Sequence, residues 1–116
     1  MYAGGSIEAV LELLDPDIVW HVPGSSPIAG DHRGRDGVAR YFERRRARVS
    51  ATMRMHPGEV MADEDAVAQF VRGSAEVDGE AVEWHTVGAY RIEAGRIAEV
   101  WLVPLDLAAF ERVWNR

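Results

Sequence analysis

Hydrophobic residues near the start of the chain recur with the period of a helix. The apolar positions follow the i, i+3, i+4, i+7 spacing of one buried stripe, and Ser6 precedes them as an N-cap. These positions are Ile7, Val10, Leu11 and Leu14. Asp15 and Pro16 are expected to end the helix, because the residue before a proline disfavours helical geometry.

A second helical pattern follows a strand and a loop. Residues 18–22 are predicted to form a short strand, and the chain from residue 23 is expected to stay irregular to about Gly34. A helix is then predicted over residues 36–48. Its buried stripe consists of Val38, Tyr41 and Phe42. The arginines of this segment are expected on the opposite, solvated side.

The rest of the chain is predicted to be β structure until near its end. The β-rich stretches are residues 52–62, 66–77, 80–92 and 96–103. Strands of this length twist and coil, and helices packed on one face would leave the sheet wrapped around them. The predicted fold class is therefore α+β, a cone-shaped half-barrel with a curved antiparallel sheet wrapped around helices. We expect residues 1–116 to form one domain with a pocket between sheet and helices.

Turn residues predict how these strands are connected. Asp78 and Gly79 predict a two-residue hairpin. The Glu-Ala-Gly sequence of residues 93–95 suits a three-residue loop, with its glycine in the left-handed conformation, whereas a two-residue loop would exchange the faces of the following strand. Pro104 is expected to end the last strand, and Asp106 to cap a closing helix. The inward side of that helix is predicted to carry Leu107, Phe110 and Trp114.

Hairpin register divides the side chains of the sheet between two faces. The apolar face should look toward the helices and line the pocket, and Trp20 and Val22 on the first strand are taken to share it. The predicted pocket residues are Trp20, Val22, Val71, Trp84, Thr86, Tyr90, Val100 and Leu102. The opposite face mixes charged and apolar residues, which suggests a homodimer contact. That face is predicted to carry Arg72, Glu83, His85 and Trp101.

Composition and charge exclude several classes of function. With 116 residues, of which 47% are hydrophobic, the chain can bury one core. No apolar run approaches the roughly 20 residues of a membrane span, and the net charge of −6 argues against nucleic acid. The lack of cysteine excludes disulfides and thiolate sites. We expect a cytoplasmic protein without metal or other cofactor, since the four histidines lack metal-ligand spacing.

The order of the motifs is similar to that of a known family. Residues 17–24 read Asp-Ile-Val-Trp-His-Val-Pro-Gly, residues 33–38 read Arg-Gly-Arg-Asp-Gly-Val, and residues 95–101 read Gly-Arg-Ile-Ala-Glu-Val-Trp. Together they resemble the SnoaL-like branch of the nuclear transport factor 2-like superfamily. The resemblance implies an α+β cone, usually a homodimer, with a ligand cavity inside. Members include ketosteroid isomerase, limonene epoxide hydrolase, scytalone dehydratase, polyketide cyclases and many plain binding modules, so the fold alone does not give the function.

The chain lacks the catalytic residues of its enzyme relatives at the positions that can be aligned. Val22 stands where ketosteroid isomerase has its base carboxylate. Gly88 stands where the same enzyme has the aspartic acid on the oxyanion side of its site. Residues 100–102 read Val-Trp-Leu, where SnoaL-like chains often have His-Trp-Asp. An enzyme that moves a proton beside a carbonyl needs a positioned base and a stabiliser for the enolate. Only residues 1–5 are available for the family's first helix, so we expect that helix to be missing or shortened.

Three functional hypotheses follow from these residues. The first is a domain that binds a small apolar or aromatic molecule, with Tyr90 as a donor or a core residue and with isomerase, cyclase or hydrolase activity left open. The second is an enzyme that uses His21, or a cluster of Arg72, His85 and Glu83. The plain alternatives are an interface histidine and a cross-strand polar network. The third hypothesis is a homodimeric association module without a ligand.

Overall fold

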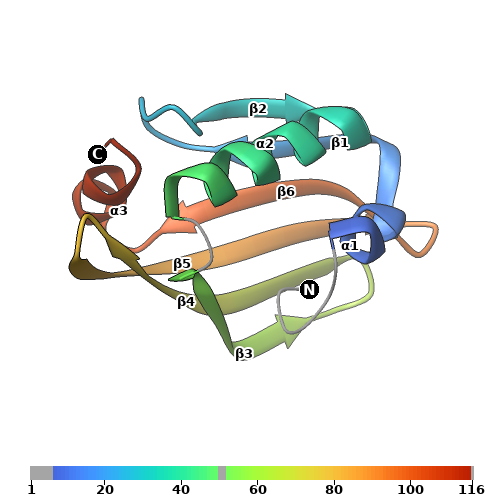
Figure 1. The fold of residues 1–116 in the computed structure, drawn as a ribbon. Coiled ribbons are helices and arrows are strands. Elements are labelled where there is room, and N and C mark those ends of the chain that lie inside the picture. Colours follow the sequence, from blue (N-terminus) through green and yellow to red (C-terminus); the bar gives the residue numbers. More distant parts are fainter. Residues whose placement is uncertain (1–6, 50–51, 116) are drawn as a thin grey trace.

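The computed structural model describes residues 7–49 and 52–115, and Figure 1 shows how the elements are arranged. The helices in these ranges are α1 (Ile7–Leu13), α2 (Gly34–Val49) and α3 (Leu107–Trp114). The strands are β1 (Leu14–Val22), β2 (Gly30–Arg33), β3 (Arg54–Ala62), β4 (Ala66–Val77), β5 (Glu80–Glu93) and β6 (Arg96–Pro104). The expected cap Ser6, the residues before it and the side chain of Ile7 lie outside the described part of the chain.

A curved, open sheet forms the frame of the fold (Figure 1). Its strands follow the order β2-β1-β6-β5-β4-β3. Neighbouring strands are antiparallel except for β1 and β6, which run parallel. Helix α2 lies across the concave side, while α1 and α3 lie toward opposite ends of the sheet. The predicted α+β class, with a curved sheet wrapped around helices, is confirmed.

The first two strands differ from the prediction. β1 begins at Leu14, directly after α1, and its pairing with β6 shifts register between Leu14 and Val19. In that interval the Asp17 backbone N–H donates a hydrogen bond of 2.8 Å to Asp15 Oδ1. The proline segment therefore bulges the strand without separating it from the helix. β2 replaces part of the loop expected to be irregular. Its Gly-Asp-His-Arg sequence has no β-branched residue, so pairing with β1 rather than intrinsic propensity makes it a strand.

The hairpin between β5 and β6 has a shorter turn than predicted. Ala94 and Gly95 form a two-residue turn with φ angles of 50° and 77°, a combination typical of type I′ hairpins. A register shift beside Ile92 then adds one residue to β6. Tyr90 consequently pairs with Val100. The bulge compensates for the shorter turn, so the predicted division of side chains between the two faces is correct.

Helix α3 begins where the sequence indicates, with one difference in packing. The Ala109 N–H donates a 3.0 Å hydrogen bond to Asp106 Oδ1, which confirms the predicted N-cap. Phe110 and Trp114 are buried as predicted. Leu107 is 45% exposed, because it belongs to the first turn, beyond the part of the helix that packs on the sheet. The prediction that Leu107 points inward is wrong.

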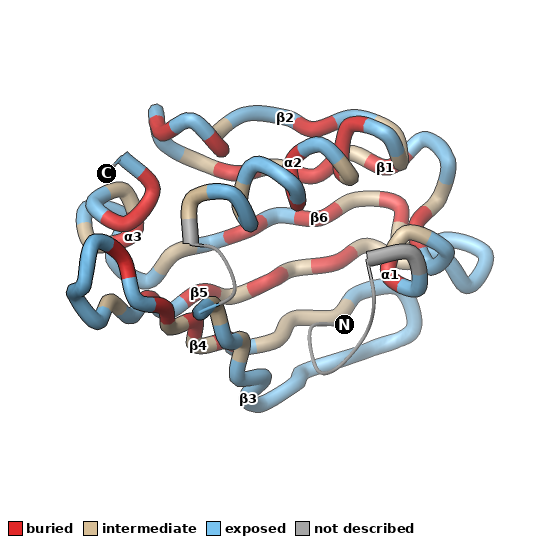
Figure 2. The backbone as a smooth tube through the Cα atoms, in the orientation of Figure 1, coloured by how far each residue is buried: buried red, intermediate tan, exposed pale blue. Residues whose placement is uncertain are grey.

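Burial follows the two faces of the sheet (Figure 2). Along β5 every second residue from Trp84 to Tyr90 is buried, as expected for a strand covered on one side. The buried side chains of the concave face join those of α2 and α3 in one hydrophobic core. β3 at the sheet edge is exposed along most of its length. None of the helices in residues 7–49 and 52–115 has the length and apolar character that a membrane crossing requires.

Candidate functional site

The eight residues predicted to line the pocket lie together on the concave face. None of the eight is more than 9% exposed. Side chains from neighbouring strands lie side by side on this face, because Val71 pairs with Thr86 and Tyr90 pairs with Val100. Trp20 reaches α2, where its ring centroid lies 5.2 Å from that of Phe42 in an edge arrangement. The structure thus brings the eight side chains to one buried surface, while their contact with a ligand stays a prediction.

Two glycines let large side chains lie close to the sheet. A Cβ atom at Gly73 would stand 2.2 Å from the indole of Trp84, so this ring lies flat over the glycine. A Cβ atom at Gly88 would stand 2.4 Å from the hydroxyl oxygen of Tyr90. Gly88 is the position where the family resemblance would place the oxyanion-side acid. The tyrosine hydroxyl therefore occupies the space into which an acid at this position would project.

The interior contains a cavity of about 10 Å³ between α2, α3, β3 and the concave face. Its polar lining residues are Tyr41, Arg45, Thr86 and Trp114. Its apolar lining residues are Met55, Trp84, Leu102 and Phe110. This volume corresponds to about one water molecule. Only Trp84, Thr86 and Leu102 among the predicted pocket residues line this cavity, and Trp20 packs instead against Tyr41 and Phe42 of α2.

Three aromatic side chains in the interior carry a hydrogen-bond donor that has no partner among the described residues. These donors are Trp20 Nε1, the Tyr41 hydroxyl and Trp114 Nε1. The exposed fractions of these residues do not exceed 1%. A buried donor left without a partner costs about 1–3 kcal/mol, and native structures contain few of them. An acceptor atom placed in this interior would recover part of that cost.

Arg45 lies at the interior, against the expectation that the arginines of α2 all face solvent. Its guanidinium carbon lies 5.4 Å from the ring centroid of Tyr41 and 5.0 Å from that of Phe42. These distances fit cation–π contacts, and Arg45 is half-buried. The expectation is wrong for this residue because Arg45 follows Tyr41 by one helical turn and so shares its inward face.

His32 is a buried residue that sequence reasoning did not place. It pairs with Trp20 across β1 and β2, and its ring stacks on Tyr41 at 4.6 Å. His32 Nε2 donates to the Ile28 carbonyl at 2.8 Å, and Arg44 donates to Nδ1 at 3.5 Å. Burial and the nearby Arg44 charge lower the pKa of His32. A neutral imidazole therefore supports one side of the Tyr41 ring.

His21 projects from the convex face, opposite the interior. Its Nδ1 contacts Asp31 Oδ1 at 2.7 Å and its Nε2 contacts Glu99 Oε2 at 2.5 Å. Both partners are carboxylates, so the protonated imidazole can donate from both ring nitrogens. Burial works to lower the pKa of His21, but the hydrogen bonds and charges of Glu99 and Asp31 raise it. The ring also stacks on Trp101 at 5.6 Å. His21 is thus an outward-facing polar residue.

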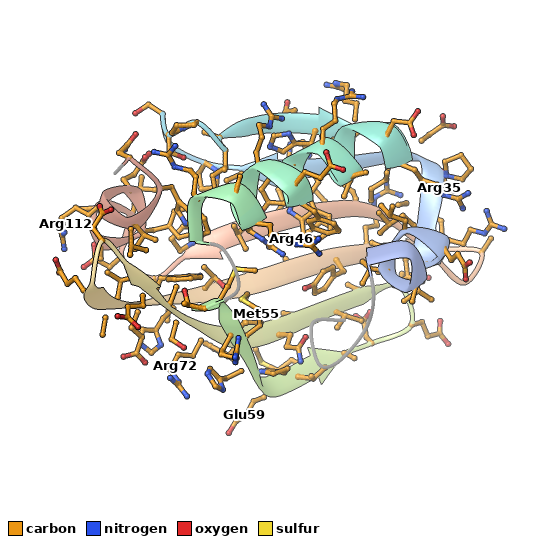
Figure 3. The ribbon with its side chains drawn as sticks, in the orientation of Figure 1. Arg35, Arg46, Met55, Glu59, Arg72 and Arg112 are labelled. Carbon is orange, nitrogen blue, oxygen red and sulfur yellow. The ribbon has the colours of Figure 1, made fainter. Side chains whose placement is uncertain are left out.

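The Arg72, Glu83 and His85 cluster also lies on the convex face, and Figure 3 labels Arg72 on the side of the sheet away from α2. Arg72 Nη1 is 3.2 Å from Glu83 Oε1, and His85 Nε2 is 3.7 Å from the same oxygen. All three side chains are 43–55% exposed. The predicted cross-strand network is present, and it cannot reach a molecule bound in the interior.

The convex face carries an apolar ridge with a groove on each side. Phe70, Val87 and Val103 form the ridge across β4, β5 and β6. The larger groove, of about 550 Å³, has a floor of Ala68 and Ala89. Its ends are formed by Met61 and Trp101. The smaller groove, of about 320 Å³, is lined by His56, Arg72, His85 and Leu105, among others. Within the described ranges no group of three metal-ligating side chains is suited to hold an ion.

Comparison with known proteins assigns the chain to a family. Bal32a, from a soil-derived mobile gene cassette, superposes with a TM-score of 0.86 at 28% identity, over 93% of this chain and 83% of that one. An NTF2-like protein of Burkholderia pseudomallei has a TM-score of 0.84 at 22% identity, over 95% and 86%. TerC, co-crystallised with polyporic acid, has a TM-score of 0.82 at 21% identity, over 95% and 86%. A search of the curated proteins found no match. A family model described as the SnoaL-like domain matches residues 1–100, and the chain therefore belongs to this family, with the NTF2-like fold.

Proposed function

We propose that this domain binds a small, planar and largely apolar molecule between the concave face of the sheet, α2 and α3. The observation that carries the proposal is that three buried aromatic side chains, Trp20, Tyr41 and Trp114, hold donors without a partner among the described residues. Aromatic walls favour flat ligands, and ligand sites usually combine such walls with a few polar groups. A bound molecule with acceptor atoms would satisfy donors that cost free energy in the closed interior.

The same interior favours binding over catalysis. Its buried polar residues in the described part of the chain are Ser26, His32 and Thr86, and none is a carboxylate. A proton-transfer enzyme needs a base within hydrogen-bond reach of its substrate. His32 is neutral and engaged by a carbonyl oxygen, and His21 projects from the opposite face. The interior is therefore equipped to hold a molecule and lacks a base to deprotonate it.

A ligand of ordinary size requires the interior to open. Small-molecule pockets usually measure about 300–1,000 Å³, against the cavity of about 10 Å³. Arg45 and Met55 line this cavity and are half-buried, and Figure 3 shows Met55 on the β3 side of the space below α2. The Met55 side chain is long and flexible, so it can swing outward and open the cavity while Arg45 stays over the rings of Tyr41 and Phe42. The co-crystallisation of TerC with polyporic acid supports small-molecule binding as a use of this fold.

Ligand binding is tested with a panel of aromatic and polyketide-like compounds. Binding is followed by tryptophan fluorescence and by the shift of the thermal midpoint, which rises when a ligand binds only the folded state. Trp84→Ala should weaken binding because it removes a wall of the interior, and Tyr90→Phe tests the hydroxyl over Gly88. Trp101→Ala, which truncates an exposed tryptophan on the convex face, is the matched control. Affinity unchanged by Trp84→Ala, or no binding by any compound, would contradict the proposal.

The convex face supports a second proposal, that two copies of this chain associate through it. The observation that favours it is the ridge between two grooves, because in a two-fold dimer each ridge can insert into the larger groove of the other copy. Phe70 and Val103 on the ridge are 38% and 47% exposed. The adjacent Arg72 and Glu83 present both signs of charge, which a second copy in antiparallel orientation can complement. The nearly filled interior is also compatible with association as the main role.

Self-association is tested by measuring the molar mass in solution. Val103→Asp places a charge at the β6 end of the ridge and should convert a dimer into a monomer, since an unpaired charge in a buried contact is costly. Leu13→Asp, at a residue of α1 that is 52% exposed, is the control and should leave the mass unchanged. A monomeric wild-type protein across the accessible concentration range would rule out this proposal.

A further inference from the structure

The lining of the interior cavity carries information about the ligand's chemical class. Of the side chains that line it, those of Tyr41, Arg45, Thr86 and Trp114 carry hydrogen-bond donors, and no described lining residue is acidic. Indole and guanidinium groups can only donate, whereas hydroxyl groups can also accept. We therefore expect an atom bound among these groups to be a hydrogen-bond acceptor, such as a carbonyl or carboxylate oxygen.

Arg45 gives this set of donors a positive charge. Its guanidinium group lies over the faces of Tyr41 and Phe42, and the rings fix it beside the cavity. A guanidinium stays charged at all ordinary pH values and matches the geometry of a carboxylate. Hydrogen bonds to charged groups are about twice as strong as those between neutral groups. In a partly buried site this difference favours an anion over a neutral acceptor.

Tyr41 and Trp114 provide the independent second observation. They are 0% and 1% exposed, and the hydroxyl and the indole N–H have no partner in the described structure. The Tyr41 ring is stacked on His32 at 4.6 Å. The Trp114 ring packs edge-on against Trp84 with centroids 5.3 Å apart. Both donors are thus held in place before any ligand arrives, which lowers the entropic cost of binding.

We propose that the ligand is an aromatic organic acid whose anionic oxygens are bound by Arg45, Tyr41 and Trp114. Its ring lies against Trp84 and Phe110, which line the same cavity. The inference rests on the proposed ligand binding, because the donors become accessible only when the interior opens. It adds the class of the ligand, an organic anion, to that proposal.

The test compares acids with their neutral counterparts. Benzoic, naphthoic and anthroic acids and the corresponding carboxamides are titrated into the protein by calorimetry at about pH 7, where the acids are ionised. For at least one pair the acid should bind the wild-type protein about tenfold or more tightly than the amide, as expected for a hydrogen bond to a charged group. The three ring sizes cover different degrees of opening of the interior.

Variants assign the preference to the proposed groups. Arg45→Met removes the charge at similar length, so it should abolish the preference for the acid and leave the amide's affinity nearly unchanged. Tyr41→Phe removes one hydroxyl and should reduce the acid's affinity several-fold. Arg46→Met, at the exposed neighbouring residue, is the control and should change neither affinity. Far-UV circular dichroism of each variant establishes that it is folded.

Each outcome tests the anion site and the more general proposal of ligand binding separately. Equal affinity for acid and amide, or an acid preference that survives Arg45→Met, would overturn the anion site while ligand binding stands. Binding of neither member of any pair, up to about 1 mM ligand, would overturn both. A preference for the acid that is lost in Arg45→Met and kept in Arg46→Met supports both.

Discussion

A methyl group added beneath Trp84 would perturb the interior at a defined point. Gly73 on β4 pairs directly with Trp84 on β5, and the indole lies over the glycine. A Cβ atom at this position would stand 2.2–2.4 Å from three atoms of the indole, Cε2, Nε1 and Cζ2. Carbon atoms do not approach one another this closely without displacement. Gly73→Ala therefore requires the indole to move.

The expected cost follows from the surroundings of the ring. Trp84 is 3% exposed and packs edge-on against Trp114, so it has little free volume to move into. Overpacking a buried site costs about 1–3 kcal/mol, and the lost aromatic pair adds about 0.5–1.5 kcal/mol. The lower entropy of the unfolded chain returns about 0.4–1 kcal/mol when alanine replaces glycine. The free energy of unfolding should fall by about 2 kcal/mol.

Urea denaturation followed by far-UV circular dichroism measures this change. The control is Gly37→Ala in α2, where the new Cβ atom would lie 3.6 Å from its nearest neighbour. Because alanine is the better helix former, this control should gain up to about 1 kcal/mol. In a Trp84→Leu background Gly73→Ala should cost much less, and a double-mutant cycle gives the difference. A loss below about 0.5 kcal/mol, or an equal loss without the indole, would refute the reasoning.

Two further perturbations test the convex face and the closing helix. Although burial opposes it, the carboxylate partners raise the pKa of His21 above 6.5, so the stabilisation from its protonated form is complete below that pH and is lost as the pH rises through the raised pKa. His21→Gln should therefore lower the thermal midpoint more at about pH 6 than at about pH 9, and an equal loss at both would contradict the assignment. Glu111 Oε1 accepts a 2.7 Å hydrogen bond from the Ser25 N–H, so Glu111→Ala should destabilise the protein by about 1 kcal/mol and speed hydrogen exchange at the Ser25 amide. An unchanged exchange rate would mean that this contact does not hold the loop to α3.

The faces of the sheet were predictable because their causes are local. The Asp78-Gly79 turn defines the pairing of β4 with β5, and the period of two then places Trp84 and Thr86 on the side of the helices. β2 and the bulge beside Ile92 could not be predicted in this way. Both depend on which strand lies alongside, and neither has a strong signal in the sequence within the segment itself.

The interior site was less predictable than the sheet. Arg45 has the spacing that places it one turn after Tyr41, and this periodicity could have identified it within an arginine-rich helix. The cavity itself could not have been identified, because its size depends on the ring orientations of Trp84 and Trp114, which a hydrophobic pattern does not contain. The unpartnered donors share this origin. Their lack of a partner is a property of the packed interior and not of any motif.

The two faces of the sheet divide the polar chemistry of the described chain in a way that limits what it can do. Side chains of the kinds that act as bases, such as His21, Glu99 and His85, lie on the convex face, where carboxylates and imidazoles are paired with one another. The cavity on the concave side is lined by hydroxyl, indole and guanidinium groups, which donate hydrogen bonds and are poor bases near neutral pH. Such a lining can stabilise negative charge on a bound oxygen but cannot remove a proton to create it. If the interior binds an organic acid as proposed, that molecule therefore already carries its negative charge when it arrives.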